Sequence, residues 1–301
     1  MQRYIVMPHG EIGMKKLCAI AAIPALLAIP TPGWATGSIN VVAAENFYGD
    51  VAQQIGGPGV QVTSILSNPD QDPHLFEASA SVARAISAAQ IVIYNGIDYD
   101  PWMEKLLGAA KAADRNTIVV ADLTGRRTGD NPHIWYDLST MLALARTLTD
   151  DLGSADPTHQ TGYQQRLVRF QQSVQPIQTR IAALRERLAG TPVTATEPVL
   201  GYMFEALGMQ VRNLPFQMAV MNSTEPSASD VAAFEKDLKT HQVRMLAYNS
   251  QASDPIAERM QKLARASRIP VVGATETEPA GKDYQAWMLS ELDAVDRALP
   301  K

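Results

Sequence analysis

The chain has 301 residues, of which 46% are hydrophobic and 19% are charged, as in ordinary soluble globular proteins, and this length is enough for two domains. The formal net charge is -5, and lysine and arginine are not clustered, which argues against a nucleic-acid-binding protein. The single cysteine, Cys18, excludes a protein held together by internal disulfides.

The first 35 residues have the pattern of a secretory signal peptide. Lys15 and Lys16 give a positive start, residues 17–29 form a 13-residue apolar core, and Ala35 ends a stretch suited to cleavage. A membrane anchor is the alternative, but a helix that crosses a bilayer needs about 20 apolar residues. We therefore expect residues 1–35 to be removed on export to the periplasm.

Two features of this leader refine the expectation. Residues before Met14 do not fit the start of a signal peptide, so Met14 is a candidate for the true start. Cys18 precedes the apolar core, which is not the place of a lipid-attachment site. The mature chain is expected to have no lipid anchor, no disulfide and no transmembrane helix.

Short apolar runs alternate with helical patterns over the first half of the mature chain. The strand-like runs are residues 39–44, 60–66, 91–94 and 117–120, and the helix-like segments are residues 47–55, 79–89, 102–113 and 138–152. This alternation is typical of a parallel sheet with crossover helices. We expect residues 36–155 to form an N-terminal α/β lobe.

Residues 157–189 carry only a helical pattern, in which apolar side chains recur three or four positions apart from Tyr163 to Leu188. Such a seam could hold a coiled-coil dimer together, but Pro176 would kink the helix. We favour a linking helix over residues 156–190 whose apolar stripe lies across two lobes of a monomer.

The alternation returns in the last third of the chain. Strand-like runs are residues 192–196, 210–214, 245–248 and 270–273, and helical segments are residues 199–207, 229–240, 254–267 and 284–299. Residues 191–301 are therefore expected to form a C-terminal α/β lobe. The fold class predicted is α/β.

Two histidines each follow a proline in a polar turn. His74 lies in the stretch NPDQDPHLFE (residues 68–77), after a strand-like run, and His133 lies in DNPHIWY (residues 130–136). Proline stiffens such a turn, so the imidazole is oriented before an ion arrives, although a lone histidine in a turn is more often a surface residue. Candidate partners for an imidazole N–H, or simple turn formers, are Asp70, Asp72 and Asn46.

Several separated motifs agree with one known family. The stretches ENFYGD (residues 45–50), residues 68–77, YNGIDYDPW (residues 94–102) and residues 131–136 resemble the cluster A-I metal-binding solute-binding proteins of bacterial ABC importers. The resemblance runs in order from about Ile39 to the C-terminus. It implies two lobes, each with a mostly parallel sheet flanked by helices, joined by one long backbone helix, with a metal ion in the cleft between them.

The resemblance also implies two ligands from the second half of the chain. Where the family has a His or Glu as third ligand, this chain has Glu197, which could instead be a carboxylate that complements a helix N-terminus. The fourth ligand of the family is usually Asp, and the matching residue is Glu276, with Glu278 as the alternative. The expected metal ligands are His74, His133, Glu197 and Glu276.

The resemblance implies a periplasmic receptor that delivers a divalent cation to the permease of an ABC importer. The cation expected is Mn²⁺ or Zn²⁺, with Fe²⁺ as a further alternative, bound as cargo and not as a resident cofactor. Residues 122–130 carry no histidine-rich run of the kind often found near here in zinc-dedicated members, which favours manganese slightly. No catalytic residues are assigned.

Two other functions could use the same ligands. A metal-dependent hydrolase needs an open metal position and a general base, but the sequence contains neither an HExxH motif nor a nucleophile elbow. A metal-scavenging adhesin that works without an importer would have the same site.

Overall fold

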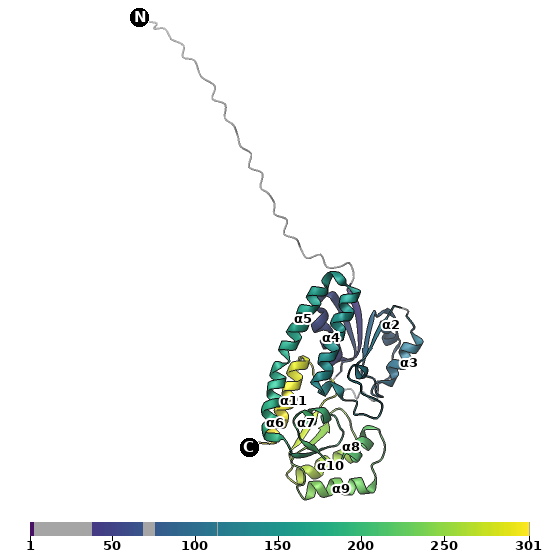
Figure 1. The fold of residues 1–301 in the computed structure, drawn as a ribbon, viewed down its shortest axis with the longest axis vertical. Coiled ribbons are helices and arrows are strands. Elements are labelled where there is room, and N and C mark those ends of the chain that lie inside the picture. The colour runs from purple at the N-terminus through teal and green to yellow at the C-terminus, as the bar shows by residue number, and fades with distance from the viewer. Residues whose placement is uncertain (3–37, 69–75, 113, 301) are drawn as a thin grey trace. The chain divides into compact units, whose positions relative to one another are not determined.

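The computed structural model describes residues 1–2, 38–68, 76–112 and 114–300, and two α/β lobes occupy residues 38–300 (Figure 1). The described residues from 38 to 300 lie in one compact unit. The expected signal peptide falls almost entirely outside the described residues. Within the described part of the chain, no helix combines the length and the apolar character needed to cross a membrane.

The N-terminal lobe contains a four-stranded parallel sheet with the strand order β2-β1-β3-β4. Its strands are β1 (Ile39–Glu45), β2 (Val60–Leu66), β3 (Ile91–Tyr94) and β4 (Asn116–Val119). Its helices are α1 (Asn46–Gly56), α2 (Ala80–Ala88), α3 (Pro101–Ala109) and α4 (Leu138–Ala155), with the 3-10 helices η1 (Gly57–Gly59), η3 (Val120–Thr124) and η4 (Ile134–Tyr136).

Strand β1 shows why this sheet is covered on both faces. Val41 and Ala43 pack in the large core that includes side chains of α1 and α4. Val42 and Ala44, which point to the opposite face, pack with side chains of α2 and α3. Burial on both faces explains the continuous apolar run in the sequence.

The C-terminal lobe repeats the plan with the strand order β6-β5-β7-β8, again all parallel. Its strands are β5 (Pro192–Ala195), β6 (Gln210–Val211), β7 (Leu246–Asn249) and β8 (Val271–Ala274). Its helices are α7 (Gly201–Ala206), α8 (Leu214–Met221), α9 (Ala228–Lys239), α10 (Pro255–Ala266) and α11 (Tyr284–Ala298). The predicted fold class, with two parallel-sheet lobes, is confirmed.

One predicted strand is too long. The segment 210–214 was expected to be extended, but β6 ends at Val211 and α8 begins at Leu214. Asn213 adopts a left-handed backbone with φ of 60°, which turns the chain, and Pro215 then occupies the first turn of α8. Proline is well suited to a first helical turn, so this short helix replaces the end of the predicted strand.

The backbone helix consists of α5 (Gln160–Ser173) and α6 (Gln175–Leu188), preceded by the 3-10 helix η5 (Pro157–His159). The two helices meet at Val174, and Pro176 stands in the first turn of α6, where its missing N–H interrupts the regular bonding. The predicted seam is buried or partly buried along both helices, at Tyr163, Leu167, Phe170, Val174, Ile177, Ile181, Leu184 and Leu188.

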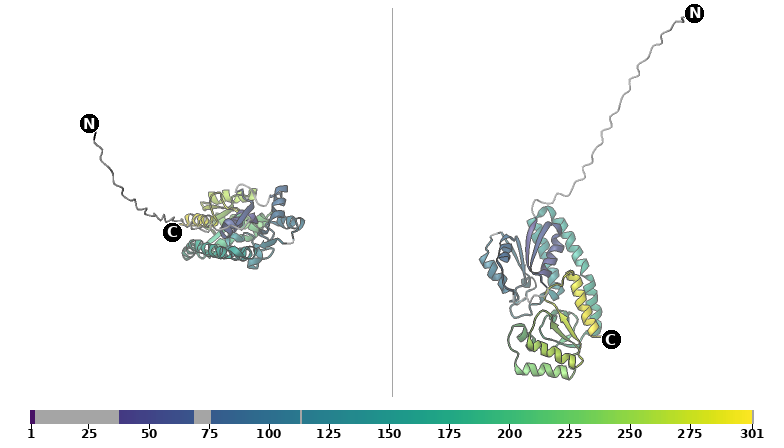
Figure 2. Two further views of the ribbon diagram at one scale, coloured as in Figure 1. Left: turned by 90° about the horizontal axis from the view of Figure 1, so that it is seen from above. Right: turned by 180° about the vertical axis from the view of Figure 1, so that it is seen from behind.

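Helix α11 links the two halves of the chain. It lies alongside α6 (Figure 2), where Arg180 binds Asp293 and Asp296 at 2.7 Å each. At its other end, the ring of Trp287 packs 5.8 Å from the ring of Phe47 in α1. One hydrophobic core therefore extends through both lobes.

Glu291 is a charged residue placed in this core. It is 7% exposed, and the indole Nε1 of Trp287 donates a hydrogen bond to its Oε1 at 3.2 Å. Burial raises the pKa of Glu291 to about 7, although the Trp287 hydrogen bond and the charge of Lys282 oppose the shift. Because the folded-state pKa is raised, the contribution of this group to stability is full below about pH 4.5 and is lost as the pH rises through about 7.

The variant Glu291→Gln should therefore stabilise the protein at pH 8 by roughly 1–3 kcal/mol and change its stability little at pH 5. Glutamine keeps an acceptor for Trp287 and removes the charge. Thermal unfolding at the two pH values measures the difference, and Glu186→Gln, on the exposed side of α6, is the matched control. An equal change in melting temperature at both pH values would contradict the assignment.

Candidate metal centre

Three neighbouring strands of the C-terminal sheet end at the candidate site. Glu197 follows β5, Asn249 is the last residue of β7, and Glu276 follows β8. Since β5, β7 and β8 are adjacent and parallel, their carboxyl ends lie side by side, which is where open α/β sheets bind ligands. The N-terminal lobe contributes His133, which precedes η4.

His133 is fully buried and held at both ring nitrogens. Its Nδ1 lies 2.6 Å from Oδ1 of Asn131, which also accepts the backbone N–H of His133 at 3.1 Å. The amide nitrogen of Asn131 donates to the carbonyl oxygen of Pro198 at 2.7 Å, so the amide oxygen faces the ring and Nδ1 carries the hydrogen. The other nitrogen, Nε2, lies 3.1 Å from Oε1 of Glu276.

Glu276 is the centre of the cluster. Its carboxylate is fully buried, and Oε1 accepts a hydrogen bond from Nδ2 of Asn249 at 2.7 Å. Its Oε2 accepts a hydrogen bond from the hydroxyl of Tyr99 at 3.1 Å. The same amide nitrogen of Asn249 donates to Oε2 of the buried Glu197 at 3.3 Å, so it joins the two carboxylates.

The structure thus brings three of the four expected ligands together. His133 contacts Glu276 directly, and Glu197 is connected to Glu276 through Asn249. His74 lies outside the described residues, together with Asp70 and Asp72. Within the ranges that the structure describes, no three or more His, Cys, Asp or Glu side chains already form a metal-ligand group.

The alternative fourth ligand, Glu278, has a different environment. Burial and the nearby charges of Asp50 and Asp283 raise its pKa to about 9. Asn46 holds its backbone from both sides, since its amide donates to the Glu278 carbonyl at 2.7 Å and its Oδ1 accepts the Glu278 N–H at 2.9 Å. Asn46 therefore fixes the loop after β8, which is not the imidazole contact that the sequence suggested.

Several residues of this cluster had only an open role from the sequence: Asn249 and Gln251 could line the site or cap the next helix, and Tyr99 could line a pocket or pack in the core. Gln251 accepts the backbone N–H groups of Glu276 and Thr277 on its side-chain oxygen and donates to Oγ1 of Thr277 at 2.7 Å. Asn131, Tyr99 and Asn249 act on the candidate ligands themselves. The only signal for Asn249 and Gln251 was their place at the end of a strand beside β5 and β8.

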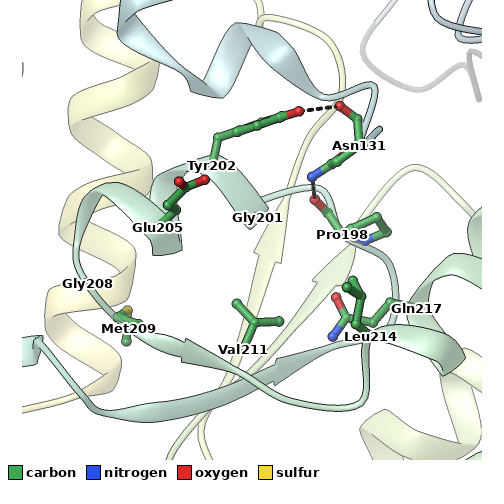
Figure 3. A pocket seen from close by; sticks show the side chains of 10 residues that line it. All are labelled: Asn131, Pro198, Gly201, Tyr202, Glu205, Gly208, Met209, Val211, Leu214 and Gln217. Atoms are coloured by element: carbon green, nitrogen blue, oxygen red, sulfur yellow. Dashed lines mark hydrogen bonds between the residues drawn. The ribbon is translucent and has the colours of Figure 1, made fainter. Parts of the chain in front are cut away.

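Asn131 and Pro198 are among the residues that line a cavity of about 440 Å³ (Figure 3). The hydroxyl of Tyr202 donates to the carbonyl of Asn131 at 2.7 Å and closes one side. Gly201 lies beneath the Asn131 amide, and a Cβ atom at this position would stand 2.6 Å from Nδ2 of Asn131. Because the Asn131 amide is bonded at both ends, it cannot move without losing its contact with His133 or Pro198.

Gly201→Ala should therefore displace Asn131 and weaken metal binding by roughly 10- to 100-fold, the usual effect of losing the partner of a metal-binding histidine. Isothermal titration with Zn²⁺ or Mn²⁺ measures the change. Gly108→Ala is the matched control, since Gly108 is also helical and nothing lies within 4 Å of its added Cβ. Wild-type affinity in Gly201→Ala would show that Asn131 does not orient a ligand.

The chain is similar to known metal-binding proteins over nearly its whole length. The family model described as zinc-uptake complex component A, periplasmic, matches residues 41–298. A putative metal-binding protein of Treponema pallidum is 24% identical, with 91% of this chain and 92% of the relative covered. The manganese-binding lipoprotein MntA of Bacillus subtilis is 23% identical over 72% of each chain.

Solved structures agree with the observed fold. The periplasmic zinc binding protein TroA from Treponema pallidum matches with a TM-score of 0.74 and 19% identity, covering 88% of this chain and 100% of that one. This likeness shows the fold, and the family model, which covers far more than half of the chain, shows the family. The chain belongs to the periplasmic zinc-uptake component A family, the zinc- and manganese-type metal-binding proteins of ABC importers.

Proposed function

We propose that this protein is a periplasmic receptor that binds one divalent transition-metal cation between its lobes and delivers it to the permease of an ABC importer. The observation that carries the proposal is the distance of 3.1 Å between Nε2 of His133 and Oε1 of Glu276. Since Asn131 holds the hydrogen on Nδ1, two lone pairs would face each other across this gap unless a cation stands between them. A proton can fill that role in the metal-free protein, and a metal ion replaces it.

The proposed ligands are His74, His133, Glu197 and Glu276. Two imidazole nitrogens and two carboxylate oxygens suit a divalent first-row cation such as Zn²⁺ or Mn²⁺. Glu276 is preferred over Glu278 because Glu276 touches His133, whereas the carboxyl of Glu278 is influenced by Asp50 and Asp283. Members of the family named for zinc and for manganese support this choice of cargo.

The hydrolase alternative is less well supported. A general base must be able to take a proton from a metal-bound water. Glu276 is the carboxylate nearest to His133, and its two oxygens already accept hydrogen bonds from Asn249 and Tyr99. This arrangement suits a carboxylate that is held still as a ligand.

The proposal includes the remaining sequence-based expectations. Residues 1–35 would be cleaved on export and leave a monomer without a lipid anchor. Residues 36–155 and 191–301 would be the two lobes, joined by residues 156–190.

The ligand assignment can be tested by thermal unfolding with and without metal. A cation that binds only the folded protein should stabilise it by about 2.7 kcal/mol at a hundredfold excess over Kd. His74→Ala, His133→Ala, Glu197→Ala and Glu276→Ala should each lose most of the shift, measured against their own metal-free melting temperatures.

Two variants serve as matched controls. His241→Asn changes a histidine that is not among the proposed ligands. Asparagine tolerates the left-handed backbone that His241 adopts, with φ of 55°. Glu258→Ala removes an exposed carboxylate of α10. Both should keep the full shift, and the metal-receptor proposal fails if all four ligand variants keep it too.

Metal binding should also weaken in mild acid. An unperturbed imidazole has a pKa of about 6.5, and only the neutral ring can donate its lone pair to a metal. Kd measured by chelator competition should rise by about tenfold or more between pH 7.5 and pH 5.5. An affinity that stays constant over this range would exclude histidine ligands.

A further inference from the structure

We propose that Glu45 keeps its carboxyl proton in the folded protein and donates it to Asp100, and that this carboxyl pair holds the loop of residues 95–100 in place. Both are positioning residues, because this loop carries Tyr99, whose hydroxyl donates to Oε2 of Glu276 at 3.1 Å. The inference goes beyond the proposed function and does not require a bound metal.

The loop after β3 has an unusual backbone. Gly96, Ile97 and Asp98 are consecutive residues in the left-handed region, with φ of 79°, 46° and 65°. A β-branched residue such as Ile97 rarely adopts a positive φ, so contacts elsewhere in the protein must impose this conformation. Because Tyr99 follows directly, its position depends on those contacts.

Asp100 supplies two of the contacts that impose this conformation. Its Oδ2 accepts the backbone N–H of Asn95 at 2.6 Å, and its Oδ1 accepts the backbone N–H of Gly96 at 2.8 Å. The side chain is 1% exposed, so water does not compete for these bonds. An ionised carboxylate is the stronger acceptor, and two such donors favour the ionised form of Asp100.

Glu45 has the opposite surroundings. It is the last residue of β1, which is adjacent and parallel to β3, and it is fully buried. Apart from Asp100 and the backbone of Glu45 itself, no described residue offers a hydrogen bond to either of its carboxyl oxygens. An ionised Glu45 would therefore be a buried charge beside a second carboxylate. A protonated Glu45 removes the repulsion and donates its O–H to Asp100.

The electrostatic surroundings agree with one negative charge on the pair. Burial, followed by the charge of Asp100, raises the pKa of Glu45 well above its usual value, and burial raises the pKa of Asp100 to about 7. The other titratable groups described around the pair are Tyr48 of α1, Tyr94 of β3 and Tyr99. Burial raises the pKa of each of these tyrosines, so they remain neutral at pH 7.5.

These shifts set the direction of the pH dependence. Because both folded-state pKa values are raised, the contribution of the pair to stability is full below about pH 4 and is lost as the pH rises through each folded-state value. Glutamine at position 45 keeps a donor for Asp100 and does not ionise. Glu45→Gln should therefore lose less melting temperature than wild type between pH 6 and pH 9.

Infrared difference spectroscopy of the metal-free protein at pH 7.5 tests the protonation directly. A protonated carboxyl absorbs at a higher C=O stretching frequency than an ionised one. Subtracting the spectrum of Glu45→Gln from that of wild type should leave one band of a protonated carboxyl. The exposed Glu225 is the matched control, and Glu225→Gln should leave no such band. A missing band for Glu45→Gln would overturn the proposal, because Glu45 would then be ionised.

Hydrogen exchange at the same pH tests the hold on the loop. Methionine is close to glutamate in size but has no donor, so Glu45→Met should exchange the amides of Asn95 and Gly96 about tenfold faster or more. Glu45→Gln should exchange them at the wild-type rate. Equal rates in all three proteins would overturn the proposal, because the loop would then not depend on the pair.

Thermal unfolding keeps the proposal testable if Glu45→Met does not fold. Parallel loss of melting temperature in wild type and Glu45→Gln from pH 6 to pH 9 would contradict it. A sodium ion is the alternative occupant between the two carboxylates. If NaCl stabilises wild type more than an equal concentration of choline chloride, and Glu45→Gln loses this difference, the pair holds Na⁺ and the proton assignment is wrong.

Discussion

The relation between His133 and Glu276 depends on an aromatic core that both lobes share. Trp135, two residues after His133, packs with its ring 4.7 Å from Phe47, and its carbonyl accepts the hydroxyl of Tyr284 from α11 at 2.9 Å. Tyr136 donates to the carbonyl of Thr275, the residue before Glu276, at 2.7 Å. A distance of 3.1 Å between two side chains from different lobes is kept because the backbone on each side is pinned by these buried rings.

A second set of contacts positions Tyr99, whose hydroxyl donates a hydrogen bond to Glu276. The buried Asp100 accepts the backbone N–H groups of Asn95 and Gly96 at 2.6 and 2.8 Å, which folds the loop after β3. Asn95 in turn donates to the carbonyl of Pro132, the neighbour of His133, at 3.0 Å. Desolvation raises the pKa of Asp100 to about 7, so this loop costs free energy to build. The loop places the Tyr99 hydroxyl against Oε2 of Glu276, whereas Asn249 and His133 contact Oε1 of the same carboxylate.

Much of the fold could be predicted from the sequence, because its strands and helices follow local patterns of apolar residues. Alternating strand and helix signals gave both parallel sheets, and the spacing from Tyr163 to Leu188 gave the buried side of α5 and α6. The short helix α8 was missed because Asn213, in a left-handed conformation, ends the extended run early. The sign of a backbone φ angle cannot be read from a pattern of apolar residues. His133, Glu197 and Glu276 were proposed as ligands because the family resemblance marks them, and the structure places them close together.

Their hydrogen-bond partners were not predictable in the same way. Asn131 and Asn249 are polar residues in turns or at strand ends, where capping is the usual explanation. Their roles depend on tertiary contacts. Asn131 is hydrogen-bonded to the ring of His133 and to the carbonyl of Pro198, and Asn249 donates to carboxylates that follow two other strands. The choice between Glu276 and Glu278 likewise depends on which residue the loop after β8 turns toward His133.

The partners described around Glu276, His133 aside, are neutral donors, and this suits a receptor that must release its cargo. An arginine or lysine would cancel the negative charge that attracts a cation, whereas the amide of Asn249 and the hydroxyl of Tyr99 hold the carboxylate and leave its charge in place. When the cation leaves, these donors remain, so the carboxylates are not left buried without partners. At the proposed site, the same donors would therefore serve both the loaded and the empty receptor.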